Sequence, residues 1–431
     1  MPDSDGGGPD PRRLYRMPWT AADNAMLWLE PTRKCNITCD ACFAPNEPHS
    51  EKPLEVIQAE VDGMLRLAKC DTILIAGGEP LTHPGIVEVV RMVARAGVKP
   101  ALVTNGVLLD SALLRDLKRA GLRSVTFHVD SHQQRPGWAG ADERALNELR
   151  ADFANILYLE RGVVCAFNTT VFPDALPQVP DVVAWAQSVP ERVHVLTLIC
   201  VRSMEPEAPF RYLAGDREVD FDHAPRAWRD ATGHLMQLDL YAAVRRAMPD
   251  FECCAFLGGT VRADSLKWSI GCVLTTGRRA YGVTGPRTME LLQNAHHLVR
   301  GRYLAYAPPR ASRLGRLTLL LGAVDPVLRR TALRYLGDVL RHPRELLRTL
   351  HVQSISLVQP VDILPNGEMD NCDGCPNRTL FEDRLVPACR LDEYRRYGAP
   401  VRAVPRAGAT RPVVAPAAAP EPRARATEPA A

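Results

Sequence analysis

The sequence contains no continuous run of about 20 apolar residues, the length that a membrane-spanning helix needs. Residues 1–13 are polar and rich in glycine, so they do not resemble the apolar core of a signal peptide. The formal net charge of +3 is small and gives no reason to expect nucleic acid as a partner. We therefore expect a cytoplasmic protein, and contact with the surface of a membrane stays open.

Cysteine, by contrast, is abundant, with twelve residues in the chain. Structural disulfides are rare in a reducing compartment, so clustered cysteines predict metal sites there. A group near the start, a group near the end and a looser middle group comprise, in that order, Cys35, Cys39 and Cys42; Cys372, Cys375 and Cys389; and Cys253, Cys254 and Cys272. The isolated Cys70, Cys165 and Cys200 are expected to be small buried hydrophobic side chains.

Between residues 25 and 201, short apolar runs alternate with longer stretches of helical periodicity. The runs predicted as buried parallel strands are 25–29, 72–76, 100–104, 124–129, 163–172 and 193–201. The helices predicted between them are 53–68, 83–96, 110–120, 141–159 and 174–187. Six consecutive strand–helix units predict an α/β fold whose parallel sheet curls into a full or partial barrel. The ligand site of such a sheet forms in the loops at the carboxyl ends of the strands.

The remainder of the chain has a different pattern. We expect a disordered N-terminus over residues 1–20, a core over 21–204 and a C-terminal α+β domain over 205–397. That domain has a helix-rich part at 288–350 and a β-hairpin at 351–372, which turns at Pro365-Asn366-Gly367. Residues 398–431 are mostly Ala, Pro and Arg and are expected to be a disordered tail.

The first motif is the CxxxCxxC spacing of Cys35, Cys39 and Cys42, in the loop after the first predicted strand. Three thiolates at this spacing can bind three irons of a [4Fe–4S] cluster and leave the fourth iron open. A structural zinc site is the alternative, although zinc normally takes four protein ligands. The spacing alone leaves both readings open.

The second motif, Gly77-Gly78-Glu79-Pro80, follows the second predicted strand. Glycine lets a backbone approach a ligand closely. A carboxylate such as that of Glu79 offers a charge-assisted acceptor to an ammonium group. In isolation the segment would be an ordinary Gly-Pro turn.

Together, these motifs at the ends of two neighbouring strands resemble those of the radical S-adenosylmethionine (SAM) superfamily. The resemblance implies a partial (βα)6 barrel and a [4Fe–4S] cluster on Cys35, Cys39 and Cys42, whose free iron chelates SAM. It implies that Gly77, Gly78, Glu79 and Pro80 contact the amino group of SAM. It also implies reductive cleavage of SAM to a 5′-deoxyadenosyl radical that takes hydrogen from a substrate, with a reductase such as flavodoxin or ferredoxin as partner.

Further positions agree with the family, and an ordinary turn or strand role is the alternative for each. The resemblance implies contact with SAM for Asn105 after the third strand, for Asp130 and Ser131 after the fourth, and for Asn168 on the fifth. Thr197 and Leu198 lie on the sixth strand, near where family members contact adenine. Many members have an aromatic residue directly before the third cysteine, but this sequence has Ala41 there. Phe43 follows instead, and we expect it to contact the cofactor.

The CxxC pair Cys372 and Cys375, followed by Cys389, has a spacing suited to metal ligands. It resembles the auxiliary-cluster domains of many radical SAM enzymes. CDGCPN and LVPACRLDEY are similar to the archaeal branch that contains pterin methylases and tetraether lipid synthase. This implies an auxiliary iron–sulfur cluster and a small-molecule or lipid substrate, with methylation or C–C bond formation. The fourth ligand is Cys272, Cys253, Cys254 or substrate, and zinc or mononuclear iron is the alternative metal.

Two other functions stay open at this point. One is a peptide-maturing radical SAM enzyme, although residues 1–25 are too short for a peptide-binding winged-helix domain. The other is a non-catalytic iron–sulfur or zinc redox protein, which would not need the GGEP segment. Residues 296–350 are rich in arginine and leucine and suit either anionic lipid, a phosphorylated substrate or an ordinary solvated helix face.

Overall fold

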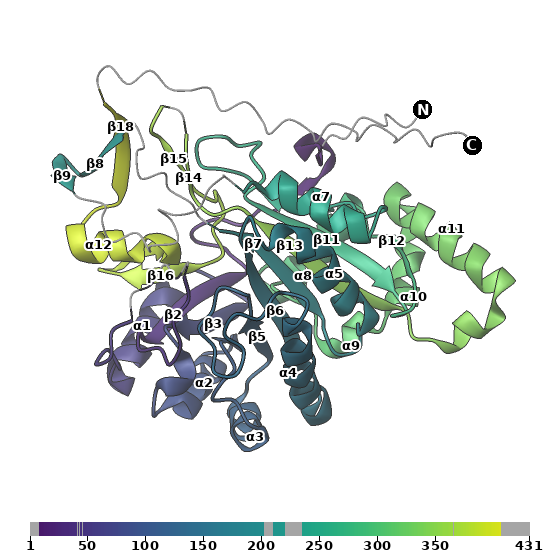
Figure 1. Cartoon of the computed structure of the whole chain (residues 1–431), viewed down its shortest axis with the longest axis horizontal. Helices are drawn as coiled ribbons and strands as arrows, with labels where there is room; N and C mark the ends of the chain where they lie inside the picture. The colour runs from purple at the N-terminus through teal and green to yellow at the C-terminus, as the bar shows by residue number, and fades with distance from the viewer. Residues whose placement is uncertain are drawn as a thin grey trace, which may run out of the picture.

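The computed structural model describes residues 8–40, 42, 44, 46–201, 210–219, 235–364 and 366–406. One eleven-stranded sheet forms its centre (Figure 1). The first half of the chain supplies β2 (Met26–Thr32), β3 (Thr72–Gly77), β4 (Lys99–Thr104), β5 (Ser124–His128), β6 (Val164–Val171) and β7 (Val195–Cys200). The helices that follow these strands are α1 (Leu54–Leu67), α2 (Ile86–Arg95), α3 (Ser111–Ala120), α4 (Leu146–Glu160) and α5 (Val179–Ser188).

These six strands are parallel and follow one another across the sheet in chain order, from β2 to β7. Local signals set several helix ends. Asp110 caps α3 by accepting from the Leu113 N–H at 2.7 Å, and Gly121 ends the helix with a φ of 117°. The predicted α/β fold with a partial barrel is confirmed for this half of the chain.

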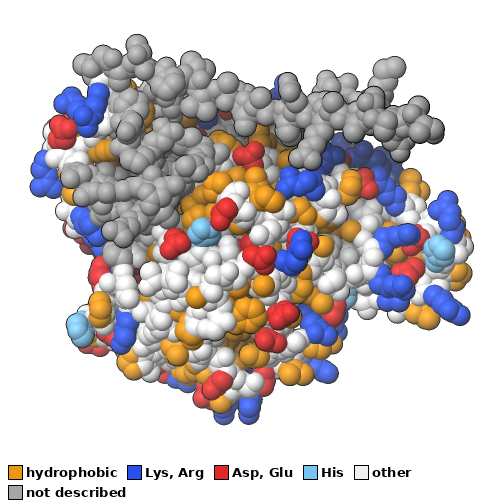
Figure 2. All heavy atoms as spheres, viewed as in Figure 1, with side chains coloured by type: hydrophobic (Ala, Val, Ile, Leu, Met, Phe, Trp, Pro, Cys, Tyr) orange, Lys and Arg blue, Asp and Glu red, His pale blue; other side chains and the backbone are white. Residues whose placement is uncertain are grey.

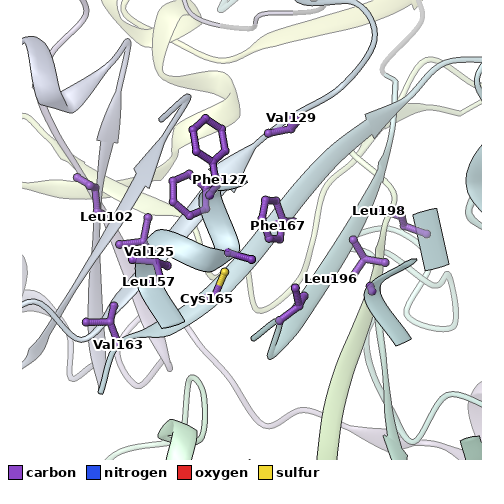
Figure 3. Packing of buried hydrophobic residues seen from close by; sticks show 14 of the residues in the cluster. Leu102, Val125, Phe127, Val129, Leu157, Val163, Cys165, Phe167, Leu196 and Leu198 are labelled. Carbon is purple, nitrogen blue, oxygen red and sulfur yellow. The ribbon is translucent and has the colours of Figure 1, made fainter. Parts of the chain in front are cut away.

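The main hydrophobic core lies between these strands and their helices (Figure 3). Phe127 of β5 stacks on Phe153 of α4 at 4.6 Å, and Phe167 of β6 packs at 5.5 Å from Phe127. Side chains alternate along a strand, so the neighbours of Phe127 and Phe167 point to the inner face of the curved sheet. His128 and Asn168 are among them, and both are half-buried.

Strands from the second half extend the same sheet. They are β10 (Ala255–Leu257), β11 (Trp268–Thr275), β12 (Ala280–Val283) and β13 (His351–Val358). β13 runs parallel to β7 and antiparallel to β11, so the sheet crosses the expected domain boundary at residue 204. Where β13 meets the first half of the chain, the side-chain amide of the buried Gln353 donates to the carbonyls of Ala186 and Val193 at 2.8 and 2.7 Å.

Parts of the two segments that were predicted to be disordered, residues 1–20 and 398–431, form strands. In the N-terminal part, β1 (Tyr15–Arg16) pairs in parallel with β10. In the C-terminal part, β18 (Val401–Pro405) pairs with β8 (Phe210–Ala214), which in turn pairs with β9 (Arg217–Val219). The partners of β1 and β18 lie far away in the sequence, so composition alone could not reveal them. Residues 1–7 and 407–431 lie outside the described residues.

The predicted hairpin at 351–372 is shorter than expected, because β13 belongs to the main sheet. The hairpin pairs β14 (Asp362–Ile363) with β15 (Met369–Asp370). Gly367 has a φ of 86° at its turn, as the Asn-Gly signal predicts, and Pro365 lies outside the described residues. A second hairpin, β16 (Arg378–Phe381) and β17 (Arg384–Pro387), is followed by α12 (Leu391–Tyr397).

The helix-rich stretch that was predicted in the second half is confirmed. Its elements, preceded by α7 (Gln237–Ala247), are α8 (Pro286–Arg300), α9 (Pro309–Ser312), α10 (Gly315–Thr318), η4 (Leu319–Ala323), α11 (Pro326–Arg341) and η5 (Pro343–Leu347). Shorter 3-10 segments are η1 (Pro11–Arg13), η2 (Pro80–Thr82), η3 (Leu176–Gln178) and η6 (Ala388–Arg390). In the described ranges, no helix has both the length and the apolarity required to cross a bilayer.

Candidate functional site

The loop of Cys35, Cys39 and Cys42 leaves the carboxyl end of β2 and lies against the loop that follows β5. Backbone hydrogen bonds join the two loops, from Asp40 N to His132 O at 3.0 Å and from Gln134 N to Thr38 O at 2.8 Å. The His132 ring also bridges Asp40 at 3.1 Å and Asp174 at 3.2 Å. The cysteine loop is therefore held over the carboxyl ends of β5 and β6, where the ligand site of a parallel sheet is expected.

The three thiols of this loop are close enough to affect one another. Burial raises the pKa of Cys39, and the charges of Asp130, Cys42 and Cys35 raise it further. Burial also raises the pKa of Cys42 and of Cys35. These three thiols form no disulfide. Their thiolate forms need a positive charge nearby, because burial and the neighbouring negative charges oppose ionisation. Metal binding supplies that charge and releases the protons.

Across the described ranges, no three His, Cys, Asp or Glu side chains converge as ligands of one metal ion. A [4Fe–4S] cluster places a different demand on the chain, because each cysteine binds a different iron. Thiolate is the usual protein ligand of such clusters. Cys35, Cys39 and Cys42 therefore fit a cluster that takes three cysteines and keeps one iron for another ligand.

The glycines of the GGEP segment allow two backbones to meet. Gly77 has a φ of 111°, and a Cβ there would lie 2.2 Å from the carbonyl oxygen of Thr32. A Cβ at Gly78 would lie 2.4 Å from the carbonyl oxygen of Lys34. The end of β3 can therefore run against the strand that leads into Cys35. The sequence analysis assigned these glycines to the approach of a ligand, and the structure shows this additional reason for them.

Glu79 is fully buried at the end of β3. Its carboxylate accepts from the Thr104 hydroxyl at 2.6 Å, from Leu81 N at 3.0 Å and from Asn105 N at 2.7 Å. Burial raises the pKa of Glu79, whereas these hydrogen bonds and the charge of Arg135 lower it. Among the described residues, no Lys, Arg or His lies within the 4.0 Å ion-pair distance of this carboxylate. A buried carboxylate without such a partner fits a cationic ligand group. Pro80, the last residue of the motif, begins η2.

Asn105 joins the GGEP segment to the cysteine loop. Its backbone N–H binds Glu79, and its side-chain amide donates to Asn36 at 2.7 Å and lies 3.9 Å from the Cys35 sulfur. The ends of β3 and β4 and the first cysteine thus form one group. These three motifs were predicted separately from the sequence, and the structure brings them together.

Asp130 lies at the end of β5, and its carboxylate accepts from His132 N at 3.1 Å and lies 3.0 Å from the Nε2 atom of His128. The Ser131 N–H donates to Glu143 at 2.7 Å. Both predicted residues therefore border the cysteine loop, although these protein groups already occupy part of their hydrogen-bonding capacity.

Polar side chains form a row across the inner face of the sheet. His128, Asn168, Thr197 and Ser356 are in register on β5, β6, β7 and β13. Ser356 was missed because β13 follows residue 204, beyond the predicted barrel. Leu198, by contrast, is buried in the main hydrophobic core, so it faces away from the inner surface. Ala41 and Phe43 lie outside the described residues.

Arg135 is a further residue that sequence reasoning missed. Its buried guanidinium donates to the carbonyls of Asn105 and His128 at 2.6 and 2.9 Å. Burial lowers the pKa of Arg135, and the negative charges of Cys39, Asp130 and Glu79 oppose this. The only signal in the sequence was its place in the same loop as Asp130. Arg135 fixes the backbone between the cysteine loop and the sheet.

The C-terminal cysteines also lie together. Burial raises the pKa of Cys372 far above its usual value, and the neighbouring Cys375 and Cys389 raise it further. Their loop is anchored by distant segments, through Asp373 N to Gly258 O at 3.0 Å and Asn24 Nδ2 to Cys375 O at 3.1 Å. This group follows the carboxyl end of β13, which is parallel to β7. Both cysteine groups therefore belong to the same edge of the sheet.

The middle cysteines form a group of their own. Cys254 and Cys272 are hydrogen-bonded to each other and lie in a separate apolar cluster with Met17 and Trp19. The charged group that acts on Cys372 is instead Lys267, which lies 2.5 Å from Asp362 and 3.5 Å from Asp370. Cys253, Cys254 and Cys272 were predicted as sources of a fourth ligand, and the structure gives no sign of them beside Cys372 and Cys375.

A family model for the radical SAM superfamily matches residues 29–174. The AdoMet-dependent heme synthase of Methanosarcina barkeri is 30% identical over 146 residues, which are 31% of this chain and 41% of that protein. The PqqA peptide cyclase of Gluconobacter oxydans is 28% identical over 171 residues, 38% of this chain and 46% of that protein. The chain spans less than half the length of these curated relatives.

Solved structures were also compared. The structure of SuiB from Streptococcus suis bound to S-adenosylmethionine has a TM-score of 0.38 at 14% identity and covers 52% of this chain and 47% of that one. The matched family region ends at residue 174, so Cys372, Cys375 and Cys389 lie outside it. Residues 29–174 of this chain are a radical SAM domain, of a superfamily that binds a [4Fe–4S] cluster and S-adenosylmethionine.

Proposed function

We propose that this chain is a radical SAM enzyme in which a [4Fe–4S] cluster on Cys35, Cys39 and Cys42 supplies reductive cleavage of SAM and the resulting 5′-deoxyadenosyl radical abstracts hydrogen from a substrate. One observation carries the proposal. The buried Glu79 carboxylate lies beside the cysteine loop, with no cationic side chain at ion-pair distance among the described residues. The ammonium group of SAM has the charge that this carboxylate requires.

We assign the other SAM contacts to residues around this group. Gly77, Gly78 and Pro80 shape the end of β3 around the amino acid part of SAM, and Asn105 holds that end against the cysteine loop. Asp130 and Ser131, which follow β5, are proposed to hold the carboxylate or the ribose of SAM, and Asn168 of β6 is proposed to reach the ribose. Phe43 is proposed as a further SAM contact.

The substrate would lie along the inner face of the sheet. There His128, Asn168, Thr197 and Ser356 offer polar atoms in one row. Such groups can fix the reacting carbon next to the cofactor and exclude water, which is the task left to the protein when a cofactor performs the difficult step. Nothing in this row is proposed to react covalently.

We further propose that residues 205–397, several of whose strands extend the main sheet, supply the substrate and auxiliary-cluster part of the chain, with Cys372, Cys375 and Cys389 as cluster ligands. The proposal is supported by the closeness and burial of these thiols. It is also supported by Lys267, whose charge lowers the pKa of Cys372 and so favours its thiolate. Iron and zinc analysis separates this proposal from a zinc site.

The segments CDGCPN and LVPACRLDEY are similar to the archaeal branch that contains pterin methylases and tetraether lipid synthase. This similarity supports a small-molecule or lipid substrate, with methylation or C–C bond formation. A peptide is the second candidate, because this chain is similar to the PqqA peptide cyclase over 171 residues. We propose flavodoxin or ferredoxin as the reductant. We also propose a cytoplasmic location, since cysteines that bind iron need a reducing compartment.

The central test is anaerobic incubation of the reconstituted chain with SAM and dithionite. Wild-type protein should form 5′-deoxyadenosine, and the Cys35→Ala/Cys39→Ala/Cys42→Ala variant should form none. Cys70→Ala, which alters a buried thiol outside all three groups, is the matched control and should keep the activity. Cleavage that persists in the triple variant would refute the proposed function.

A further inference from the structure

Residues 309–350 form a helical lobe at one end of the molecule, made of α9, α10, η4, α11 and η5 (Figure 1). We call it the leucine–arginine lobe. One face of α11 holds it to the body: Leu328, Tyr335 and Val339 are buried, and Tyr335 packs edge-on against Tyr281 of β12 at 5.1 Å. The opposite face of α11 therefore points away from the protein.

That outward face carries large apolar side chains. Leu333, Leu336 and Leu340 follow helical spacing along α11, and Leu340 is 82% exposed. The neighbouring segments add Leu320 of η4 and Leu347 of η5, which are 71% and 87% exposed. Nine of the 22 large apolar side chains that are exposed in the described ranges lie in this lobe. Exposed apolar surface of this extent marks a contact with a partner or a membrane.

Most of the charged side chains within the lobe itself are arginines. Between residues 310 and 348 the sequence has nine arginines, no lysine and three acidic residues. Two of these acids bind groups of the protein itself. Asp325 is buried and caps α11, and Asp338 accepts from the Tyr281 hydroxyl at 2.9 Å. Figure 2 shows basic and hydrophobic side chains intermixed over this end of the molecule.

Several of these arginines have free guanidinium groups. Within the part of the chain that the structure describes, Arg310, Arg313, Arg329 and Arg344 have no acidic side chain within 4.0 Å. Arg330 and Arg334 make only solvent-exposed ion pairs, with Glu252 at 3.6 Å and Asp250 at 2.9 Å. Exposed ion pairs contribute little to stability, so these two arginines can also bind an anionic surface.

We propose that the leucine–arginine lobe docks on an anionic lipid bilayer, with its arginines among the headgroups and its leucines at the boundary of the acyl chains. The kind of exposed apolar side chain favours this partner over a protein. Protein interfaces are enriched in arginine and in aromatic side chains. This lobe has the arginines, but its exposed apolar side chains are leucines and a valine, and Tyr281 and Tyr335 beneath them are buried. The docking surface is separate from the SAM site.

The test is co-sedimentation of the reconstituted full chain with vesicles of phosphatidylcholine, with and without phosphatidylglycerol. We expect binding to the mixed vesicles that weakens with salt, and little binding to the neutral ones. Leu336→Ser/Leu340→Ser should lower the partition coefficient by about tenfold. Arg329→Gln/Arg344→Gln should lower it by about 25-fold, at roughly fivefold for each arginine.

Matched controls come from the barrel helices. Leu159 of α4 is 77% exposed, and the Arg119 side chain of α3 is 78% exposed, so Leu159→Ser and Arg119→Gln should bind vesicles like the wild type. Circular dichroism and thermal unfolding should be alike for all variants. Equal binding to neutral vesicles, no binding at all, or unchanged binding by the lobe variants would overturn the proposal. Dimerisation that the leucine variant abolishes would identify a second copy as the occupant instead.

Discussion

The two cysteine groups lie at the same edge of one sheet, but they are built in different ways. Most contacts of the Cys35 loop come from the ends of neighbouring strands, through Glu79, Asn105 and His132. One contact is distant in the sequence, since Arg33 beside the loop pairs with Asp392 of α12. The loop of Cys372 and Cys375 is held by segments far away in the sequence, including Asn24 and Gly258. A site on a repeating βα unit can thus be inferred from the order of its motifs, whereas the C-terminal group depends on long-range contacts.

The charges around the two groups also differ. Asp130 and Glu79 act on the first group, and the buried Arg135 interacts with both acids and with Cys39. Lys267 is the cation that acts on Cys372 in the second group. The difference suits the two proposed roles, because a site for SAM needs acids that meet an ammonium group, while an auxiliary cluster needs compensation of thiolate charge.

The largest expected effect is on iron content. Cys372→Ala/Cys375→Ala/Cys389→Ala should lower iron from about eight to about four atoms per chain, because one of two [4Fe–4S] clusters loses its ligands. The same variant should still form 5′-deoxyadenosine, because Cys35, Cys39 and Cys42 remain. Wild-type protein with about four irons and one zinc would replace the auxiliary cluster by a zinc site. About four irons and no zinc would remove the second site.

The next effect is on SAM affinity. Glu79→Gln removes the charge and keeps the size, but its single amide oxygen can replace only one of the two carboxylate oxygens that accept from Thr104 and Asn105. We expect SAM to bind about 10- to 100-fold more weakly, since a hydrogen bond to a charged group contributes about 1.5–3 kcal/mol. Equilibrium binding to the reconstituted protein measures this, and the absorption spectrum of the cluster should not change. Glu88→Gln on α2 is the control. Equal affinity in the Glu79 variant would make the GGEP segment only a turn.

A smaller effect is expected on stability at the C-terminal group. Lys267→Met leaves the buried Asp370 without its cation, and breaking a buried pair in this way costs about 3–5 kcal/mol. Denaturant unfolding measures the loss. Arg144→Met breaks the exposed pair with Asp181 and should cost less than about 1 kcal/mol. If Lys267→Met were as mild as this control, the lysine would not hold the C-terminal loop.

The smallest effect is on the pH dependence of stability, where β13 meets the first half of the chain. Burial lowers the pKa of His194 to about 4, and its carbonyl accepts from Ser354 N of β13 at 3.0 Å. The unfolded chain takes up this proton near pH 6.5, before the folded chain does, so stability should fall by about 3 kcal/mol at most from pH 6.5 to 4. The free energy of unfolding against pH measures this. His194→Gln should flatten the curve, and an equally steep curve in that variant would contradict the assignment.

Much of the first half could be predicted because its signals are local. Every predicted strand and helix from 25 to 201 overlaps an observed element, since period-two and helical patterns act within one segment. Leu198 shows the limit of this reasoning. Its strand was identified, but alternation puts it in the core and Thr197 on the inner face. The roles of Arg135 and Ser356 were missed, because nothing near them in the sequence distinguishes them from ordinary polar residues.

The sequence by itself indicated a radical SAM domain, because its cysteine spacing and its GGEP segment, each after one of two predicted neighbouring strands, resemble the motifs of that superfamily. Only the tertiary structure decided that β10, β11 and β13 extend the same sheet, that Lys267 lies beside Cys372, and that the arginines and leucines of one lobe face outward together. The physical reason is the sequence distance between the residues that contact one another. Spacing and periodicity record contacts within a few residues, whereas pairing between distant strands and the exposure of a helix face depend on the folded chain as a whole.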